Sequence, residues 1–150
     1  MSSTDAPPLA GWGQRLGAEI IDALVVGLAV SVVGRLVGLW GAGTVGLVFV
    51  ASLAYNAVLD GDERGQTLGK RAFDIAVRDV DGSAGIGLAR AVRRALLPAA
   101  VSALNGAWLG NRTFGFSIGV IGLVDGLWPL WDRCKHALHD KLARSIVIQE

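Results

Sequence analysis

The residues best able to do chemistry lie at the start of the first long apolar stretch: Arg15, Glu19 and Asp22. Their spacing of four and then three residues places them on one face of a helix, within about 60° of one another. The apolar sequence around them predicts a membrane-spanning helix. An ionised Asp inside such a helix costs about 2.5–3.5 kcal/mol, so it normally has a partner, a water-filled cavity or a function. These residues therefore indicate a polar site near one membrane surface.

A second carboxylate, Asp125, is predicted to lie at much the same depth as Asp22, in the last apolar stretch. Asn56 and Ser52, one turn apart in the second stretch, offer neutral oxygens beside them. Two carboxylates in a low-dielectric site repel each other, and such a pair can exchange protons for cations. One hypothesis is therefore a proton or cation site made of Arg15, Glu19, Asp22, Asp125 and Asn56.

A structural interpretation of the same residues stays open. Arg15 would then anchor to lipid phosphates, and Asp22 would bond Arg15 or a loop amide to hold the fold together, because buried charges need partners. Replacing Asp22 by Asn separates the two interpretations. Lost cation flux with unchanged assembly supports transport, whereas loss of folded protein supports the structural role.

The C-terminal segment contains His136 and His139, three residues apart and close to Cys134. Imidazole pairs at this spacing occur in metal sites, but one cluster with no distant Cys or His cannot complete four ligands. We therefore predict no metal. An amphipathic interfacial helix is expected instead, in which Asp140 bonds a basic residue elsewhere in the chain: Lys70, Arg71 or Arg15.

No motif in the chain indicates a catalytic nucleophile or the general base of a zinc enzyme. We therefore predict no enzyme activity and no cofactor. Residues 41–46 match the dinucleotide fingerprint G-x-G-x-x-G, but they follow a long apolar stretch rather than a short strand, which favours a turn between two helices. The net charge of +1 argues against nucleic-acid binding, which needs a concentrated basic surface.

Composition places the chain among membrane proteins, since 52% of its 150 residues are hydrophobic and only 18% are charged. We predict a single domain, residues 1–150, with an all-α membrane fold built on a four-helix transmembrane bundle. Residues 1–14 are expected to form a flexible cytoplasmic N-terminus. The spans, judged by their length and apolar character, are expected near residues 16–40, 42–59, 95–109 and 114–131.

Basic residues concentrate on one side of the predicted membrane. Apart from Arg35 and Arg112, every Lys and Arg falls at the start of the first span, in the 60–94 loop or in the C-terminal tail. By the positive-inside rule, both termini are expected in the cytoplasm, with an even number of spans across the cell inner (plasma) membrane.

The 60–94 loop has structure of its own. Residues 73–80 alternate apolar and polar side chains, which is typical of a strand, and Asp81-Gly82 is a turn dipeptide. The tail at residues 145–149 is also strand-like. We therefore predict a small cytoplasmic β element that pairs residues 74–80 with residues 145–149.

Three segments together resemble the RDD family of bacterial integral membrane proteins: Arg15 with Asp22, the run from Gly65 to Arg71, and Ala137-Leu138-His139-Asp140. The likeness covers roughly residues 11–149. It implies that the Arg and two Asp that name the family are Arg15, Asp22 and Asp140, with Asp132 as the other candidate for the last. It further implies that the family motif includes Gly65, Gln66, Thr67, Gly69, Lys70 and His139.

Two alternative functions, from different classes, are considered for this chain. The family resemblance implies small-solute or ion transport, with cation/proton antiport proposed for some members. Such a transporter is expected to be a homo-oligomer, since four short helices leave little room for a transport pathway within one subunit. The alternative is a non-catalytic accessory or assembly subunit of a larger membrane complex. In both cases the lipid bilayer is a partner.

Overall fold

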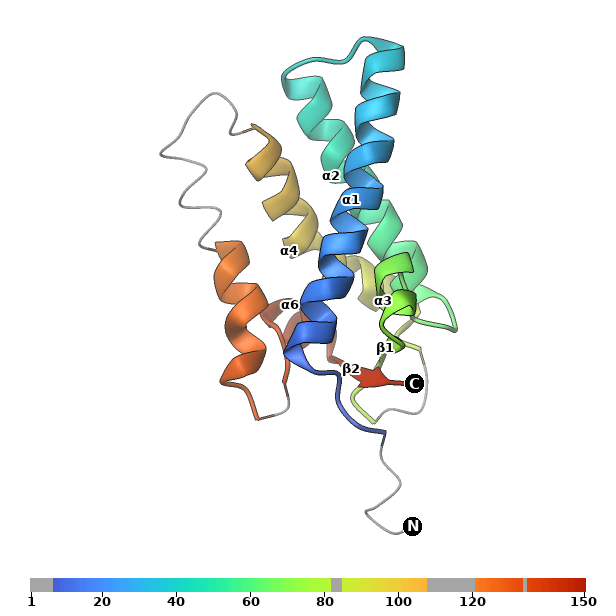
Figure 1. The fold of residues 1–150 in the computed structure, drawn as a ribbon, viewed down its shortest axis with the longest axis vertical. Helices are drawn as coiled ribbons and strands as arrows, with labels where there is room; N and C mark the ends of the chain where they lie inside the picture. Colours follow the sequence, from blue (N-terminus) through green and yellow to red (C-terminus); the bar gives the residue numbers. More distant parts are fainter. Residues whose placement is uncertain (1–6, 82–84, 108–120, 134) are drawn as a thin grey trace.

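The computed structural model describes residues 7–81, 85–107, 121–133 and 135–150. Its two longest apolar helices, α1 (Trp12–Val37) and α2 (Ala42–Gly61), are joined by a short turn and lie side by side (Figure 1). Both are long and apolar enough to cross a membrane. Their large apolar side chains point outward, as in Leu24, Leu28 and Leu36, which are 68%, 69% and 81% exposed. Because a soluble protein buries such a face, these helices are those of a membrane protein.

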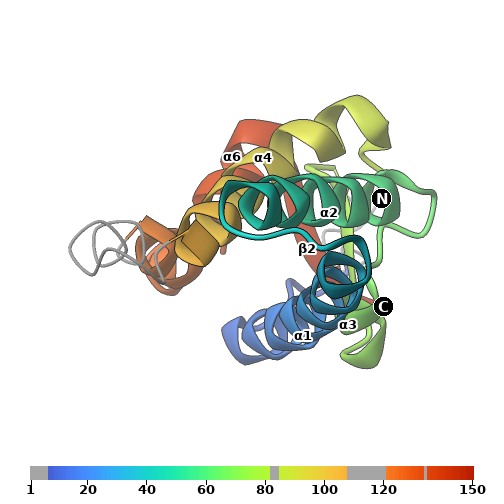
Figure 2. The same cartoon turned by 90° about the horizontal axis from the view of Figure 1, so that it is seen from above.

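The third long helix, α4 (Gly87–Ala107), differs from the predicted span at residues 95–109. It begins earlier, inside the predicted loop, and its first half carries Arg90 and Arg94. The helix keeps these charges because they pair with carboxylates of neighbouring elements, Arg90 with Asp79 and Arg94 with Asp60. The helix packs along α2, which in turn contacts α1 (Figure 2).

A shorter apolar helix occupies Ile121–Leu130 and ends in the 3₁₀ turn η2 (Trp128–Leu130). The first part of the predicted span at residues 114–131, and with it Arg112, lies outside the described residues. The described chain therefore contains two helices that are both long and apolar enough to span a membrane, and the four-span bundle stays a prediction.

Residues 75–79 and 145–149 pair as strands, within the segments predicted to do so, and the cytoplasmic location of this β element stays a prediction. Strands β1 (Ile75–Asp79) and β2 (Ser145–Gln149) form an antiparallel two-stranded sheet with Val77 opposite Val147. Both of these valines are buried, and the sheet packs with Ala18 of α1 in one core cluster. The short helices α3 (Leu68–Ala72) and α6 (Leu138–Ala143) precede the two strands. All four elements lie at the N-terminal end of α1 (Figure 1).

Residues 8–10, directly before α1, are hydrogen-bonded to β2, in contrast to the flexible N-terminus expected over residues 1–14. The Ala10 amide donates to the Val147 carbonyl over 2.9 Å, and the Gln149 amide donates to the Pro8 carbonyl over 2.8 Å. Leu9 thereby forms a bridge with Ile148 of β2. These hydrogen bonds form along the edge of β2 that is not paired with β1. The residues before α1 are coil-forming, so the sequence did not predict this pairing.

Candidate functional site

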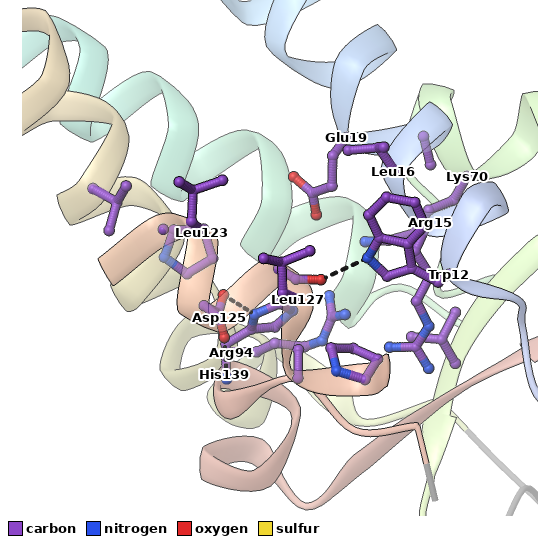
Figure 3. A pocket seen from close by; sticks show the side chains of 18 of the residues that line it. Trp12, Arg15, Leu16, Glu19, Lys70, Arg94, Leu123, Asp125, Leu127 and His139 are labelled. Carbon is purple, nitrogen blue, oxygen red and sulfur yellow. Dashed lines mark hydrogen bonds and ion pairs between the residues drawn. The ribbon is translucent and has the colours of Figure 1, made fainter. Parts of the chain in front are cut away.

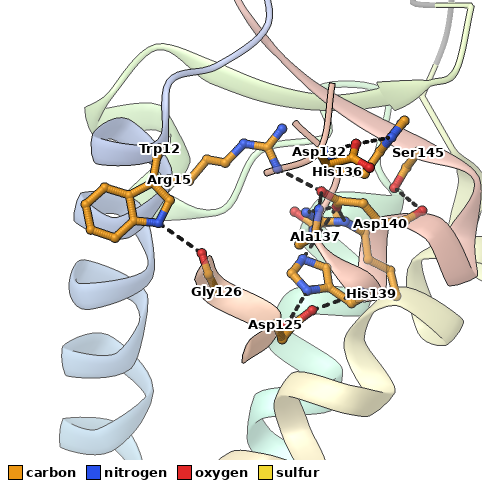
Figure 4. Close-up of polar contacts among 12 residues, drawn as sticks. Trp12, Arg15, Asp125, Gly126, Asp132, His136, Ala137, His139, Asp140 and Ser145 are labelled. Carbon is orange, nitrogen blue, oxygen red and sulfur yellow. Dashed lines mark hydrogen bonds and ion pairs between the residues drawn. The ribbon is translucent and has the colours of Figure 1, made fainter. Parts of the chain in front are cut away.

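The centre of the polar end of the molecule is Asp140, whose side chain is fully buried. Its Oδ2 accepts a hydrogen bond from Nη1 of Arg15 over 2.7 Å. Its Oδ1 accepts from Nε of Arg94 over 2.9 Å and lies 2.8 Å from Nη2 of the same residue. The backbone amide of Ala137 also donates to Oδ2, at 3.1 Å (Figure 4). Of the three partners predicted for Asp140, the structure therefore selects Arg15.

A second buried carboxylate, Asp60 at the end of α2, extends this network. Arg94 donates to its Oδ2 through Nη1, and Lys70 of α3 donates to its Oδ1. The resulting chain of contacts runs from Arg15 through Asp140, Arg94 and Asp60 to Lys70. It joins α1, α6, α4, α2 and α3, and it contains three cations and two carboxylates.

Arg94 and Asp60 were not among the site residues predicted from the sequence. Both lie at the ends of apolar stretches, and Arg94 counted there only among the basic residues that fix membrane topology. A usable signal was present, because an Asp ending one predicted span and an Arg preceding another come to the same side of the membrane. This structural role explains their burial.

The network holds Asp140 in its charged form. Burial by itself would raise the pKa of this carboxyl, but the charges of Arg94, His139 and Arg15 outweigh burial and bring the pKa well below its usual range. Asp140 therefore acts as a fixed negative charge between two guanidinium groups.

Asp22 occupies a different site, which it shares with α3. It accepts hydrogen bonds from the Tyr55 hydroxyl at 2.7 Å, the Thr67 hydroxyl at 2.5 Å and the Gly69 amide at 2.8 Å. Gly69 is required here, because a Cβ at that position would stand 2.1 Å from the Ala18 carbonyl oxygen. Asp22 thus fastens α3 against α1, as the loop-amide form of the structural interpretation predicts.

Asp125 is held by His139. Its Oδ1 accepts from the His139 amide over 3.1 Å, and its Oδ2 lies 2.6 Å from Nδ1 of the same residue. The other ring nitrogen of His139, Nε2, stands 3.5 Å from Asp140. Asp22 and Asp125 share no hydrogen-bond partner among the described residues, and only Asp125 lines the cavity described below. The structure therefore does not bring the two carboxylates into one cation site.

The remaining sequence candidates have local partners. Asn56 donates to the Ser52 carbonyl one turn earlier on α2, and Gln66 donates to the Ile75 carbonyl and to Glu150. Gly65 takes a left-handed φ of 56° against the Val77 carbonyl.

The two histidines of the C-terminal segment turn to different carboxylates, His136 to Asp132 and His139 to Asp125. Within the described ranges, no group of three His, Cys, Asp or Glu side chains could hold a metal ion. Cys134 lies outside those ranges.

A cavity of about 300 Å³ lies between α1, α4 and the helix Ile121–Leu130 (Figure 3). Charged groups form one part of its wall, and apolar side chains form most of the rest. The indole N–H of Trp12 donates to the Gly126 carbonyl over 2.9 Å and ties α1 to the third wall helix. The ionisable residues that line the cavity are Arg15, Glu19, Lys70, Arg94, Asp125 and His139.

Arg15 brings unused hydrogen-bonding capacity to this cavity. Its Nη1 is engaged by Asp140, but its Nε and Nη2 are buried and have no hydrogen-bond partner among the described residues. Buried charged donors are rarely left in this state, because burial removes the water that would otherwise bond them.

Comparison with known proteins gives a family match. The sequence model described as the RDD family matches residues 9–144, which is most of the chain. Neither the curated proteins nor the solved structures contain a match. The matched region includes Arg15, Asp22 and Asp140.

Proposed function

Because this chain belongs to the RDD family, and because its apolar helices are those of a membrane protein, we propose that it transports a small solute which binds in the cavity between α1, α4 and the helix Ile121–Leu130. The observation that carries this proposal is Arg15. The residue lines a cavity large enough for a small ligand, and two of its guanidinium donors are buried without a partner among the described residues.

The arrangement supports a solute site more than the cation/proton exchange site expected from Asp22 and Asp125. All the hydrogen bonds that Asp22 accepts come from neutral donors, and both oxygens of Asp125 are engaged by His139. A carboxylate whose oxygens already accept these hydrogen bonds is a weaker ligand for a cation. The unpaired hydrogen-bond donors on the cavity wall belong instead to a cation, Arg15.

We place the protein in the cell inner membrane, with several spans and both termini in the cytoplasm. Two features support this placement. The segment leading into α1 pairs with β2 at one end of the molecule (Figure 1), and that end carries most of the Lys and Arg.

Cysteine labelling tests this topology. In a Cys134→Ala background, a membrane-impermeant maleimide should label Trp40→Cys from outside intact spheroplasts, because Trp40 is exposed at the opposite end of α1. Arg144→Cys, on the exposed face after α6, should be labelled only after disruption. Labelling of Arg144→Cys in intact spheroplasts would overturn the assignment.

Transport is tested in proteoliposomes by uptake of labelled succinate, inorganic phosphate, sodium and rubidium, with empty liposomes as background. Gly126→Leu adds bulk at the cavity wall, where a new Cβ meets no atom within 4 Å. Gly27→Leu is the matched control, since Gly27 is equally exposed on a helix, has the same open surroundings and does not line the cavity.

Uptake of one solute that falls in Gly126→Leu and not in Gly27→Leu is the expected result. Absence of uptake for all four probes, together with a stoichiometric partner retained in mild detergent, would replace the transport proposal by the accessory-subunit function.

A further inference from the structure

The free side of the Arg15 guanidinium has the geometry of an anion site. Nη1 is turned to Asp140, whereas Nε and Nη2 remain without partners. Nε–H and Nη2–H form two parallel donors, the fork that binds carboxylate and phosphate through two hydrogen bonds at once. The ion pair with Asp140 fixes the plane of this fork in advance.

No acceptor for this fork comes from the other polar residues of the cavity wall. Asp125 is occupied by His139, and Asp140 already receives Arg15 through Nη1. Glu19, one turn further along α1, lies near enough for an electrostatic effect on Arg15 but makes no hydrogen bond to it. Among the described residues the fork therefore has no acceptor, and a bound anion would supply one.

The rest of the cavity is apolar. Leucines from α1 and from the helix Ile121–Leu130 stand above the guanidinium (Figure 3), and α4 adds Pro98 and Val101. Such walls accept a hydrocarbon chain and offer nothing to a fully hydrated ion. The leucines concerned are Leu16, Leu123 and Leu127.

We propose that the ligand of this cavity is an anionic amphiphile, a carboxylate or phosphate group on a single apolar chain, with the anionic group bound by Nε and Nη2 of Arg15. The inference rests on the proposed function, since it names the solute class of the same cavity.

Binding is measured with the full-length protein in phosphatidylcholine nanodiscs, using labelled decanoate and subtracting the signal of empty nanodiscs. Decanol, acetate and decyltrimethylammonium serve as probes that lack the charge, the chain or the correct sign of charge. Saturable decanoate binding, with each of the other probes at least about tenfold weaker, is the expected result, since losing the charge-assisted hydrogen bonds or the buried chain removes at least that much affinity.

Arg15→Lys keeps a cation that can face Asp140 but removes the fork, so it should weaken decanoate binding about tenfold. Arg71→Lys is the matched control, because Arg71 is exposed and away from the cavity, and it should bind like the wild type. Melting temperatures of both variants establish that they are folded. The cavity-wall variant Gly126→Leu should also lose decanoate binding.

Equal decanoate binding by folded Arg15→Lys and wild type would overturn the inference, as would equal binding of decyltrimethylammonium. Lysophosphatidylglycerol, a single-chain anionic lipid, added to the nanodiscs distinguishes the source of the ligand: competition with decanoate assigns the anionic group to a membrane lipid, and lack of competition assigns it to a free acid, each with the site intact.

Failure of the inference is distinct from failure of transport. Uptake of another solute, sensitive to Gly126→Leu and without decanoate binding, would refute the amphiphile alone. Decanoate binding without uptake of any solute would refute transport alone.

Discussion

Nη1 of Arg15 and Oδ2 of Asp140 stand 2.7 Å apart, although 125 positions separate the two residues in the chain. The pair links the first turn of α1 to α6, and Asp140 passes the link on to Arg94 of α4. Since the carboxylate is fully buried and both cations are largely so, removing either sign of charge leaves the other without compensation.

Asp140→Asn is expected to lower the free energy of unfolding by about 3–5 kcal/mol, the usual cost of leaving a buried ion pair without one partner. Thermal unfolding followed by circular dichroism in mild detergent measures the effect. Asp132→Asn is the control, because Asp132 pairs with the partly exposed Lys141 and its loss should be far milder. Equal melting temperatures for the two variants would contradict this account of the network.

Stability should fall steeply in acid because of the same carboxyl. The pKa of Asp140 in the folded protein lies well below its value of about 3.9 in an unfolded chain, so the folded state is favoured by the ionised form. The contribution is therefore complete above about pH 5 and is lost as the pH falls through 3.9 toward the folded pKa.

Melting temperature measured between pH 7 and pH 3 checks this dependence. The wild type should lose more stability over that interval than Asp140→Asn, which lacks the titrating group. Parallel curves for the two proteins would show that another group causes the acid sensitivity.

Asp22→Asn should reduce the amount of folded protein rather than alter a transport step alone. The amide would replace a charge that accepts three hydrogen bonds, from Tyr55, Thr67 and Gly69, and each bond to a charged group contributes about 1.5–3 kcal/mol. Membrane-inserted yield and melting temperature measure the effect. Asp62→Asn, at an exposed position beyond α2, is the control. Normal stability of Asp22→Asn would return Asp22 to the list of functional candidates.

Gly69→Ala should separate α3 from α1. The new Cβ would lie 2.1 Å from the Ala18 carbonyl oxygen and 2.9 Å from Cγ of Asp22, so backbone has to move, at a cost of about 1–3 kcal/mol or more. Gly13→Ala is the matched control, because Gly13 lies in helix α1 with no atom within 4 Å of the added Cβ. Limited proteolysis near residues 63–74 should increase for Gly69→Ala only, and equal resistance of both variants would refute the close approach.

The local secondary structure of this protein could be predicted from its sequence. The long apolar stretches at α1 and α2 and the alternation at residues 73–80 and 145–149 each depend on short-range periodicity, and the structure has the corresponding elements. The pairing of Arg15 with Asp140 was also among the predicted partners, because a buried charge in either segment needed an opposite charge within reach.

Only the tertiary structure decided how the polar residues are divided among sites. Asp22 and Asp125 have similar predicted depths, but one faces α3 and the other faces His139, because depth along a helix does not specify which neighbour a face meets. The first half of α4 was predicted as loop because it carries arginines. It is helical because those arginines pair with Asp79, Asp60 and Asp140. Contacts between residues far apart in the chain determine both outcomes, and no periodicity in the sequence encodes them.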